Sequence, residues 1–276
     1  MQIHTTIASL RAALAGTGRV AFAPTMGNLH DGHISLMRQA RSHGDAVVSS
    51  IFVNRLQFGP NEDFDKYPRT FQQDCDRLAD AGVDHLFAPD EKELYPQPQQ
   101  YVIQPASAHD SILEGAFRPG HFQGVATVVA KLFNIVRPTT ALFGKKDYQQ
   151  LMVIRNMVAE LNMGIDVIGC ETVRAADGLA LSSRNGYLSA AERVEAPRLS
   201  AELRRIVEAI IAGQRDYAAL EQGATQVLVQ HGWKPDYISI RQQADLQAPE
   251  GNAPLVVVAA VRLGNTRLID NMEVAR

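Results

Sequence analysis

The chain has 276 residues, of which 46% are hydrophobic and 21% charged, and its formal net charge is −3. These values are typical of globular proteins, and the slight acidic excess disfavours a nucleic-acid-binding surface. The two cysteines, Cys75 and Cys170, form no disulfide framework and suit a reducing cytoplasm. Met1–His4 has neither a basic start nor an apolar core, so we expect no signal peptide. The apolar runs are too short to predict a membrane span.

Strand and helix patterns alternate through the first 170 residues. We expect strands at Val20–Pro24, Ala46–Val53, Val83–Ala88, Thr140–Phe143 and Ile165–Val173, and helices at Gly32–His43, Thr70–Ala81, Gly124–Val136 and Tyr148–Asn162. In the second of these helices, Leu78 and Ala79 should face inward, with Thr70 as a cap and Gly82 as a stop. Alternation of this kind predicts a parallel sheet with helices on both faces, whose ligands bind outside the carboxyl ends of the strands.

The pattern changes after about residue 175. A long helix pattern at Glu192–Ala212 carries one proline, Pro197, and a second helix is expected from Tyr217 to His231. Three antiparallel strands then follow, at Tyr237–Arg241, Leu255–Arg262 and Arg267–Asn271, the last two joined by a hairpin signal at Gly264-Asn265. We therefore predict a first domain over residues 1–174 and a smaller α+β domain over 175–276, which could act as a lid.

The most informative motif lies where the first buried strand turns into a helix. It reads Pro-Thr-Met-Gly-Asn-Leu-His-Asp-Gly-His over residues 24–33. A spacing of three on the first helical turn places His30 and His33 on one face. The helix start also offers unpaired backbone N–H groups and a positive dipole end, so the motif predicts an anion site where both imidazoles meet a phosphate.

Two other interpretations of this histidine pair stay open from the residues alone. Both rings could be surface histidines in a loop. They could also bind a metal, although helical metal pairs favour a spacing of four with further ligands, and neither cysteine lies near. His85, His109 and His231 have no such company and are expected to be structural.

Three further segments carry groups suited to phosphates or small acids. Gly144-Lys145-Lys146-Asp147 follows a strand, where an ammonium suits phosphate oxygens and a carboxylate suits magnesium. Two hydroxyls and a guanidinium at Ser182–Arg184 also suit phosphate. The carboxamides of Asn54, Gln57 and Gln150 bind hydroxyl and carboxylate groups without adding charge. Each of these three also has an interpretation without a ligand. The alternatives are a solvated charged turn for Gly144–Asp147, a capping segment for Ser182–Arg184 and ordinary loop polarity for the carboxamides. The Gly115–Phe122 loop suits either a pocket wall or a subunit contact.

Five motifs in the same order resemble the pantoate–β-alanine ligase (pantothenate synthetase) family. They are the decapeptide above, Phe-Val-Asn-x-x-Gln-Phe from Phe52, Arg-Pro-Gly-His-Phe from Arg118, Gly-x-Lys-Asp-Tyr-Gln-Gln from Gly144, and Leu-Ser-Ser-Arg-Asn from Leu181. The resemblance extends from Val20 to Asn271. The decapeptide also resembles the HIGH motif of the wider nucleotidylyl-transferase superfamily, and the Ser-Ser-Arg segment resembles its KMSKS loop.

The resemblance implies a Rossmann-like first domain and a cytoplasmic homodimer that joins pantoate to β-alanine. Pantoate would attack Mg-ATP to give pantoyl adenylate and pyrophosphate, and β-alanine would then displace AMP. No nucleic acid or membrane partner is implied. Phosphoryl transfer needs positioning and charge stabilisation more than a nucleophile, which suits these residues.

The family's functional residues transfer to this chain position by position. His33 resembles the family's proton donor, and His30, Lys146 and Arg184 complete the implied catalytic set. Gln57 and Gln150 are implied to bind pantoate with Asn54, while Val128 and Val129 face its methyl groups. Asp147 is the implied metal contact. The implied ATP-binding residues are Met26, Gly27, Asn28, Leu29, His30, Asp31, Gly32, His33, Gly144, Lys145, Lys146, Asp147, Val173, Leu181, Ser182, Ser183 and Arg184.

Two residues depart from the family pattern. Arg55 stands where proline is usual, which frees the backbone and adds charge. Lys145 stands where an acidic or amide residue is commoner. The competing functions are another adenylyltransferase, which would not need Gln57 and Gln150, and a nucleotide-binding regulatory module without turnover. An aminoacyl-tRNA synthetase is disfavoured, since no basic tRNA-binding domain follows.

Overall fold

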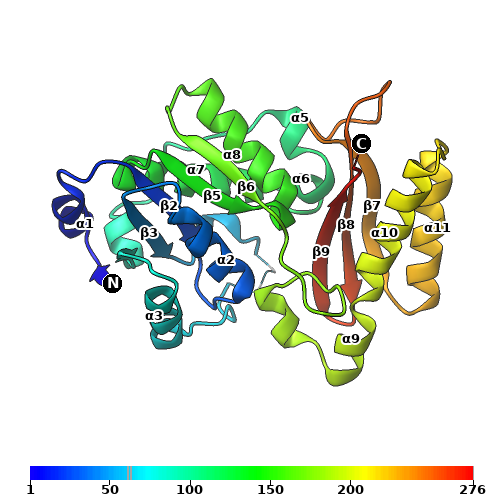
Figure 1. Ribbon diagram of the computed structural model, residues 1–276, viewed down its shortest axis with the longest axis horizontal. Helices are drawn as coiled ribbons and strands as arrows, with labels where there is room; N and C mark the ends of the chain where they lie inside the picture. The colour runs from blue at the N-terminus through cyan, green and yellow to red at the C-terminus, as the bar shows by residue number, and fades with distance from the viewer. Residues whose placement is uncertain (61, 63, 276) are drawn as a thin grey trace. The chain divides into compact units, whose positions relative to one another are not determined.

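The computed structural model describes residues 1–60, 62 and 64–275, and its contacts divide the chain into two compact units. The first unit comprises Met1–Gly144 and Val153–Cys170, and the second comprises Lys145–Met152 and Glu171–Arg276. The chain therefore crosses between the units after residues 144, 152 and 170. Figure 1 labels most of the helices and strands that follow.

The first unit is built on a six-stranded sheet in which every neighbouring pair is parallel. The strand order is β1-β4-β3-β2-β5-β6. The strands are β1 (Gln2–His4), β2 (Val20–Thr25), β3 (Ala46–Ile51), β4 (His85–Phe87), β5 (Thr140–Gly144) and β6 (Asp166–Cys170). The helices between them are α1 (Ile7–Leu14), α2 (Asp31–Ala40), η1 (Arg55–Gln57), α3 (Phe71–Asp80), α4 (Glu91–Leu94), α5 (Ser107–Asp110), α6 (Leu113–Phe117) and α7 (His121–Val136).

Helices cover both faces of this sheet, as the alternating pattern predicts. Successive residues of β2 point to opposite faces because the side-chain period of a strand is two. Ala21 and Ala23 belong to a buried cluster shared with α2 and α3. Phe22 lies between them and packs edge-to-face on Phe133 of α7, with ring centroids 6.4 Å apart. The carboxyl end of β2 leads into α2, and that of β3 leads into η1.

The second unit contains a three-stranded antiparallel sheet with the order β7-β8-β9. Its elements are η2 (Lys145–Asp147), η3 (Ser183–Tyr187), α9 (Ala190–Glu195), α10 (Arg198–Ile211), α11 (Tyr217–Gln230), β7 (Lys234–Gln242), β8 (Leu255–Leu263) and β9 (Thr266–Glu273). Helix α8 (Tyr148–Glu160) begins here and ends in the first unit. The predicted hairpin is present, since Leu263 pairs with Thr266 across Gly264-Asn265. Leu203 and Trp233 belong to its buried core.

Two predictions about helices are wrong. Glu192–Ala212 forms two helices, because Pro197 lacks a backbone N–H and serves as the N-cap of α10. Ala79 is exposed, and the buried face of α3 instead carries Asp74, Cys75 and Leu78. The other predicted elements differ from the observed ones by a few residues at their ends, while the patterns predict neither β1 and α1 nor the short helices α4, α5 and α6. Among the described residues, no helix is both long and apolar enough to cross a membrane.

Candidate active site

The two histidines of the first motif lie together at the start of α2. His30 is the N-cap, and its Nδ1 accepts a hydrogen bond from the backbone N–H of Gly32 at 3.1 Å. His33 Nδ1 accepts one from the backbone N–H of His30 at 3.3 Å. The ring centroids are 4.0 Å apart. The spacing of three thus brings both imidazoles to one face of the first turn.

These capping bonds determine where each ring carries its proton. Because a backbone N–H donates to Nδ1, that atom holds a lone pair, and the neutral ring carries its proton on Nε2. Each imidazole is therefore a hydrogen-bond donor at Nε2. In one respect the arrangement differs from the predicted anion site: the N–H groups of His30 and Gly32 are bound by the imidazoles rather than unpaired. The donors for an anion are then the rings themselves.

A buried carboxylate of α3 supports the loop that precedes these histidines. Asp74 is 1% exposed and accepts hydrogen bonds from the backbone N–H groups of Asn28 at 2.9 Å and Leu29 at 2.8 Å. The Thr70 hydroxyl donates a third at 3.1 Å. Gly27 has a φ of +83°, and a Cβ atom there would lie 3.1 Å from Asp74 Oδ2. The left-handed turn and the carboxylate therefore fit each other, and only glycine suits both.

Asp74 is a functional candidate that the sequence motifs miss. The available signal was its position four residues before Leu78, which places a carboxylate on the apolar face of α3. Arg77, one residue before Leu78, adds a second support, since its Nη1 donates to the Leu29 carbonyl at 3.1 Å. Arg77 also forms an ion pair with Asp31. Helix α3 thus holds the histidine loop through both backbone and side-chain contacts.

Asn54 and Gln57 are linked by a side-chain hydrogen bond across η1. Asn54 is 1% exposed, and its Nδ2 donates to Gln57 Oε1 at 3.1 Å. The Tyr95 hydroxyl donates to Asn54 Oδ1 at 2.9 Å, and burial raises the pKa of that phenol, so it stays protonated. This chain of bonds orients the Gln57 amide with Nε2 toward Met26 Sδ at 3.3 Å.

The Gly115–Phe122 segment contributes two side chains that hold η1. His121 donates from Nδ1 to the Gln57 carbonyl at 2.8 Å, and Arg118 Nη1 lies 3.0 Å from His121 Nε2. Arg118 also binds Glu62 through two bonds of 2.6 Å. Burial lowers the pKa of His121 to about 4, aided by the Arg118 charge and opposed by the Gln57 carbonyl. A neutral His121 can accept from Arg118 while donating to Gln57.

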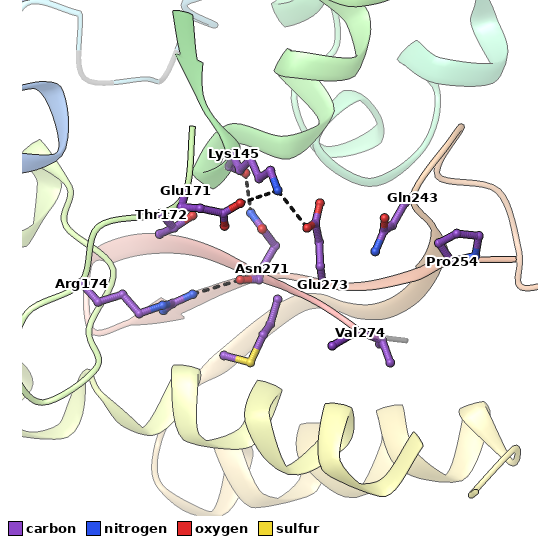
Figure 2. Close-up of a pocket in the computed structure, with 11 residues that line it drawn as sticks. Lys145, Glu171, Thr172, Arg174, Gln243, Pro254, Asn271, Glu273 and Val274 are labelled. Carbon is purple, nitrogen blue, oxygen red and sulfur yellow. Dashed lines mark hydrogen bonds and ion pairs between the residues drawn. The ribbon is translucent and has the colours of Figure 1, made fainter. Parts of the chain in front are cut away.

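In the second unit, η2 presents the predicted lysines. Lys145 Nζ binds Glu171 Oε1 at 2.6 Å and Glu273 Oε2 at 2.9 Å. Burial alone would lower the pKa of Lys145, but its hydrogen bonds to the two carboxylates outweigh burial and raise the pKa. The charge that Lys145 adds is therefore offset inside the unit. A pocket of about 570 Å³ lies beside these side chains (Figure 2).

The Leu181–Arg184 segment is shaped by short-range hydrogen bonds in the same unit. The Leu181 N–H donates to the Val173 carbonyl at 3.0 Å, so these two predicted ATP contacts are backbone partners. Ser182 is the N-cap of η3, where its Oγ accepts from the Arg184 N–H at 3.2 Å. The segment thus holds a fixed turn rather than an extended loop.

The predicted site residues divide between the two units. The first holds Met26–His33, Asn54, Gln57, Val128, Val129 and Gly144, and the second holds Lys145, Lys146, Asp147, Gln150, Val173 and Leu181–Arg184. Val128 and Val129 are both buried on α7. Asp147 is exposed, and no group of three His, Cys, Asp or Glu side chains suited to a metal occurs in the described part of the chain. His85 is not isolated as expected, since its Nδ1 lies 3.1 Å from Nε2 of His4.

Comparison with known proteins identifies the family. A family model described as pantoate-beta-alanine ligase matches residues 2–273. The chain belongs to the pantoate–β-alanine ligase family. A solved pantothenate synthetase from Thermus thermophilus has a TM-score of 0.96 at 45% identity, with all of both chains covered. A pantoate–β-alanine ligase from Francisella tularensis, described as complexed with "Beta-gamma ATP" and β-alanine, has a TM-score of 0.85 at 38% identity, covering 99% of this chain and 97% of its own.

Membership of the pantoate–β-alanine ligase family confirms the resemblance drawn from the five motifs. The fold also matches, with a six-stranded parallel sheet flanked by helices and a small antiparallel sheet toward the C-terminus. The protein is therefore an enzyme, a ligase of pantothenate synthesis. The other adenylyltransferases and the module without turnover do not account for a match over nearly the whole chain.

Proposed function

We propose that this ligase joins pantoate to β-alanine through a pantoyl adenylate. In the first step a carboxylate oxygen of pantoate bonds to the α-phosphorus of ATP while the bond to the β-phosphate breaks and pyrophosphate leaves. In the second step the β-alanine nitrogen bonds to the acyl carbon, the bond to AMP breaks, and the amine gives up a proton. The Francisella tularensis relative, described as bound to "Beta-gamma ATP" and β-alanine, supports these two substrates here.

The arrangement of His30 and His33 carries this proposal. Both neutral rings hold their proton on Nε2 at the start of α2. Negative charge grows on the leaving pyrophosphate, and donors fixed in advance stabilise charge that develops in a transition state. We assign both histidines to the phosphates, with His33 as proton donor. The loop from Met26 to His33 binds ATP with them.

The paired amides suit pantoate. Asn54 orients the Gln57 amide, and we assign Gln57, Asn54 and Gln150 to the hydroxyl and carboxylate groups of pantoate. Neutral donors hold the carboxylate without a strong ion pair, which leaves it a better nucleophile. Val128 and Val129 supply apolar surface for the methyl groups of pantoate.

Groups of the second unit serve the triphosphate. We assign Lys146 and Arg184 to phosphate oxygens as charge develops, with the hydroxyls of Ser182 and Ser183 as further donors. Gly144, Lys145, Val173 and Leu181 complete the ATP-binding set. The Lys145 ammonium is bound by two carboxylates, so its contribution comes through the position of η2 rather than direct charge.

Magnesium enters this scheme as part of the substrate Mg-ATP. Mg²⁺ commonly binds proteins through one or two carboxylates together with substrate phosphates. Asp147 offers one exposed carboxylate next to Lys146. A single carboxylate fits an ion that arrives with the nucleotide better than a resident metal centre.

We further propose a cytoplasmic homodimer without nucleic acid or membrane partners. Residues 1–174 would form the Rossmann-like domain for ATP and pantoate, and residues 175–276 the smaller lid domain. The low cysteine content suits a reducing compartment. Size-exclusion chromatography with light scattering tests the dimer.

Pyrophosphate release tests the function directly. We expect release from Mg-ATP only when pantoate is present, and pantothenate with AMP only when β-alanine is added. Release without pantoate would indicate another adenylyltransferase. ATP binding with no release under any combination would indicate a binding module.

A further inference from the structure

The side chain of Asn271 bridges two consecutive carbonyl groups of η2. Its Nδ2 donates to the Lys145 carbonyl and to the Lys146 carbonyl, both at 2.8 Å, and the residue is 6% exposed. Figure 2 shows Asn271 on β9 directed at Lys145. An amide nitrogen has two donors, and here both are used on the backbone of the segment that carries Lys146.

The preceding residue, Asp270, ties the same strand to another segment. Arg174 binds its carboxylate through two bonds, of 2.7 and 2.9 Å, and also donates to the Asn271 carbonyl at 3.0 Å. Arg174 donates in addition to the Gly178 carbonyl at 3.1 Å and pairs with Ala180 in an isolated bridge. The turn of residues 174–180 is followed by Leu181 and then by the Ser182–Arg184 segment.

The two segments meet around β9 within the second unit. A cavity of about 10 Å³, room for roughly one water molecule, is lined by residues that include Lys146, Ser182 and Asp270. One strand therefore fixes both phosphate-assigned segments relative to each other. Asp270 is 4% exposed, and its charge is offset by Arg174.

We propose that Asn271 and Asp270 are positioning residues that set Lys146 and the Ser182–Arg184 segment in register for the triphosphate. This inference rests on the proposed function, which gives those two segments their role. Asn271 acts through the backbone of η2, so its loss lets Lys146 shift without removing any charge. A shift of about 1 Å at a reacting group can cost on the order of 100-fold in rate.

A double-mutant cycle tests the proposal, with single-turnover pyrophosphate release and ATP affinity as readouts. We expect Asn271→Ala to slow release by roughly 100-fold. If Asn271 works through Lys146, the double variant with Lys146→Ala is no slower than Lys146→Ala alone, whereas an independent structural defect adds to it. Gln242→Ala is the matched control, because its Nε2 donates at 2.8 Å to the Ala248 carbonyl, outside η2.

A second double-mutant cycle combines Asp270→Asn with Arg184→Ala and is measured by the same two readouts. This cycle replaces the first one if Asn271→Ala does not fold. Non-additive effects in either cycle support the proposal. Additive effects in both, or Asn271→Ala at the rate of Gln242→Ala, would overturn it. If the wild-type enzyme releases no pyrophosphate, the proposed function is wrong, and the cycles are then read on ATP affinity alone.

Discussion

The rings of His30 and His33 lie with centroids 4.0 Å apart, and each accepts a backbone hydrogen bond at Nδ1. The two residues thus cap α2 reciprocally, in the manner that a serine and a glutamate do in a capping box. The same bonds that stabilise the helix fix the tautomer of both rings. The capping of α2 and the donor role of the two rings therefore both depend on the Nδ1 atoms of His30 and His33.

Replacing either histidine should slow adenylate formation much more than it weakens ATP binding. Loss of one donor fixed in advance commonly raises a barrier by about 3–4 kcal/mol. His33→Gln keeps an amide donor near Nε2, whereas His33→Asn keeps only an acceptor near Nδ1, so the first should retain more activity than the second. Single-turnover pyrophosphate release and ATP titration measure the two effects. Near-wild-type rates in both His30→Ala and His33→Ala would refute the assignment.

Asp74→Asn should reduce both stability and activity. The new NH₂ group would face the N–H of Asn28 or Leu29, and an unsatisfied buried donor costs about 1–3 kcal/mol. Urea unfolding and pyrophosphate release measure the two losses. Asp76→Asn is the control, because Asp76 is exposed on the same helix and its carboxylate accepts a hydrogen bond from the Gln72 side chain at 2.9 Å rather than from the histidine loop. Equal behaviour of the two variants would show that Asp74 does not hold the loop.

Lys146→Ala and Gln57→Ala should each impair the binding of a different substrate. An ammonium suits phosphate and a neutral amide suits a hydroxy acid, so the first change should act through ATP and the second through pantoate. Separate titrations of ATP and pantoate distinguish them. The assignment is wrong if Lys146→Ala alters only the constant for pantoate.

His121 should make stability fall as the pH is lowered. Its pKa is about 4 in the folded protein against 6.5 for an ordinary histidine. Between these values the unfolded chain binds the proton and the folded protein does not, so stability rises with pH across this window. As the pH falls from 6.5 to 4, the free energy of unfolding should decrease by about 3 kcal/mol.

Urea unfolding at several pH values measures this dependence. His121→Asn keeps a donor for the Gln57 carbonyl but cannot titrate, so its stability should vary less with pH than that of the wild type. His4 and His85, whose pKa values are also lowered by burial, are present in both proteins and cancel in the comparison. Identical pH profiles would show that His121 is not held neutral.

Arg55→Pro should be tolerated. Arg55 is the first residue of η1, a position that accepts proline, and Asn54 before it has an extended backbone at φ −83° and ψ 109°. The change removes an exposed pair with Glu91 at 3.2 Å, worth about 0–1 kcal/mol. Proline should stabilise the folded protein by about 0.4–1 kcal/mol, because it reduces the conformational entropy of the unfolded chain. Steady-state kinetics at low and high salt check this, and roughly a hundredfold loss toward pantoate in a folded variant would make Arg55 a substrate ligand.

Periodicity predicted the sheet well because buried parallel strands are continuous apolar runs. Val20–Pro24 and Ala46–Val53 gave β2 and β3 nearly to their ends. Periodicity failed at Pro197, where the apolar spacing continues across the break between α9 and α10 and so predicts one helix instead of two. A local pattern of this kind does not report where a backbone N–H is missing.

Residue types and short spacings were sufficient to predict the family and the parallel sheet, because both leave motifs and periodicity along the chain. The residues that hold the candidate site groups in place became visible only in the folded structure. Asp74 lies more than forty residues after the loop that it supports, and Asn271 lies more than a hundred after η2. Contacts between residues so far apart leave no periodic trace in the chain. A buried carboxylate or amide acts on whichever backbone the fold brings to it.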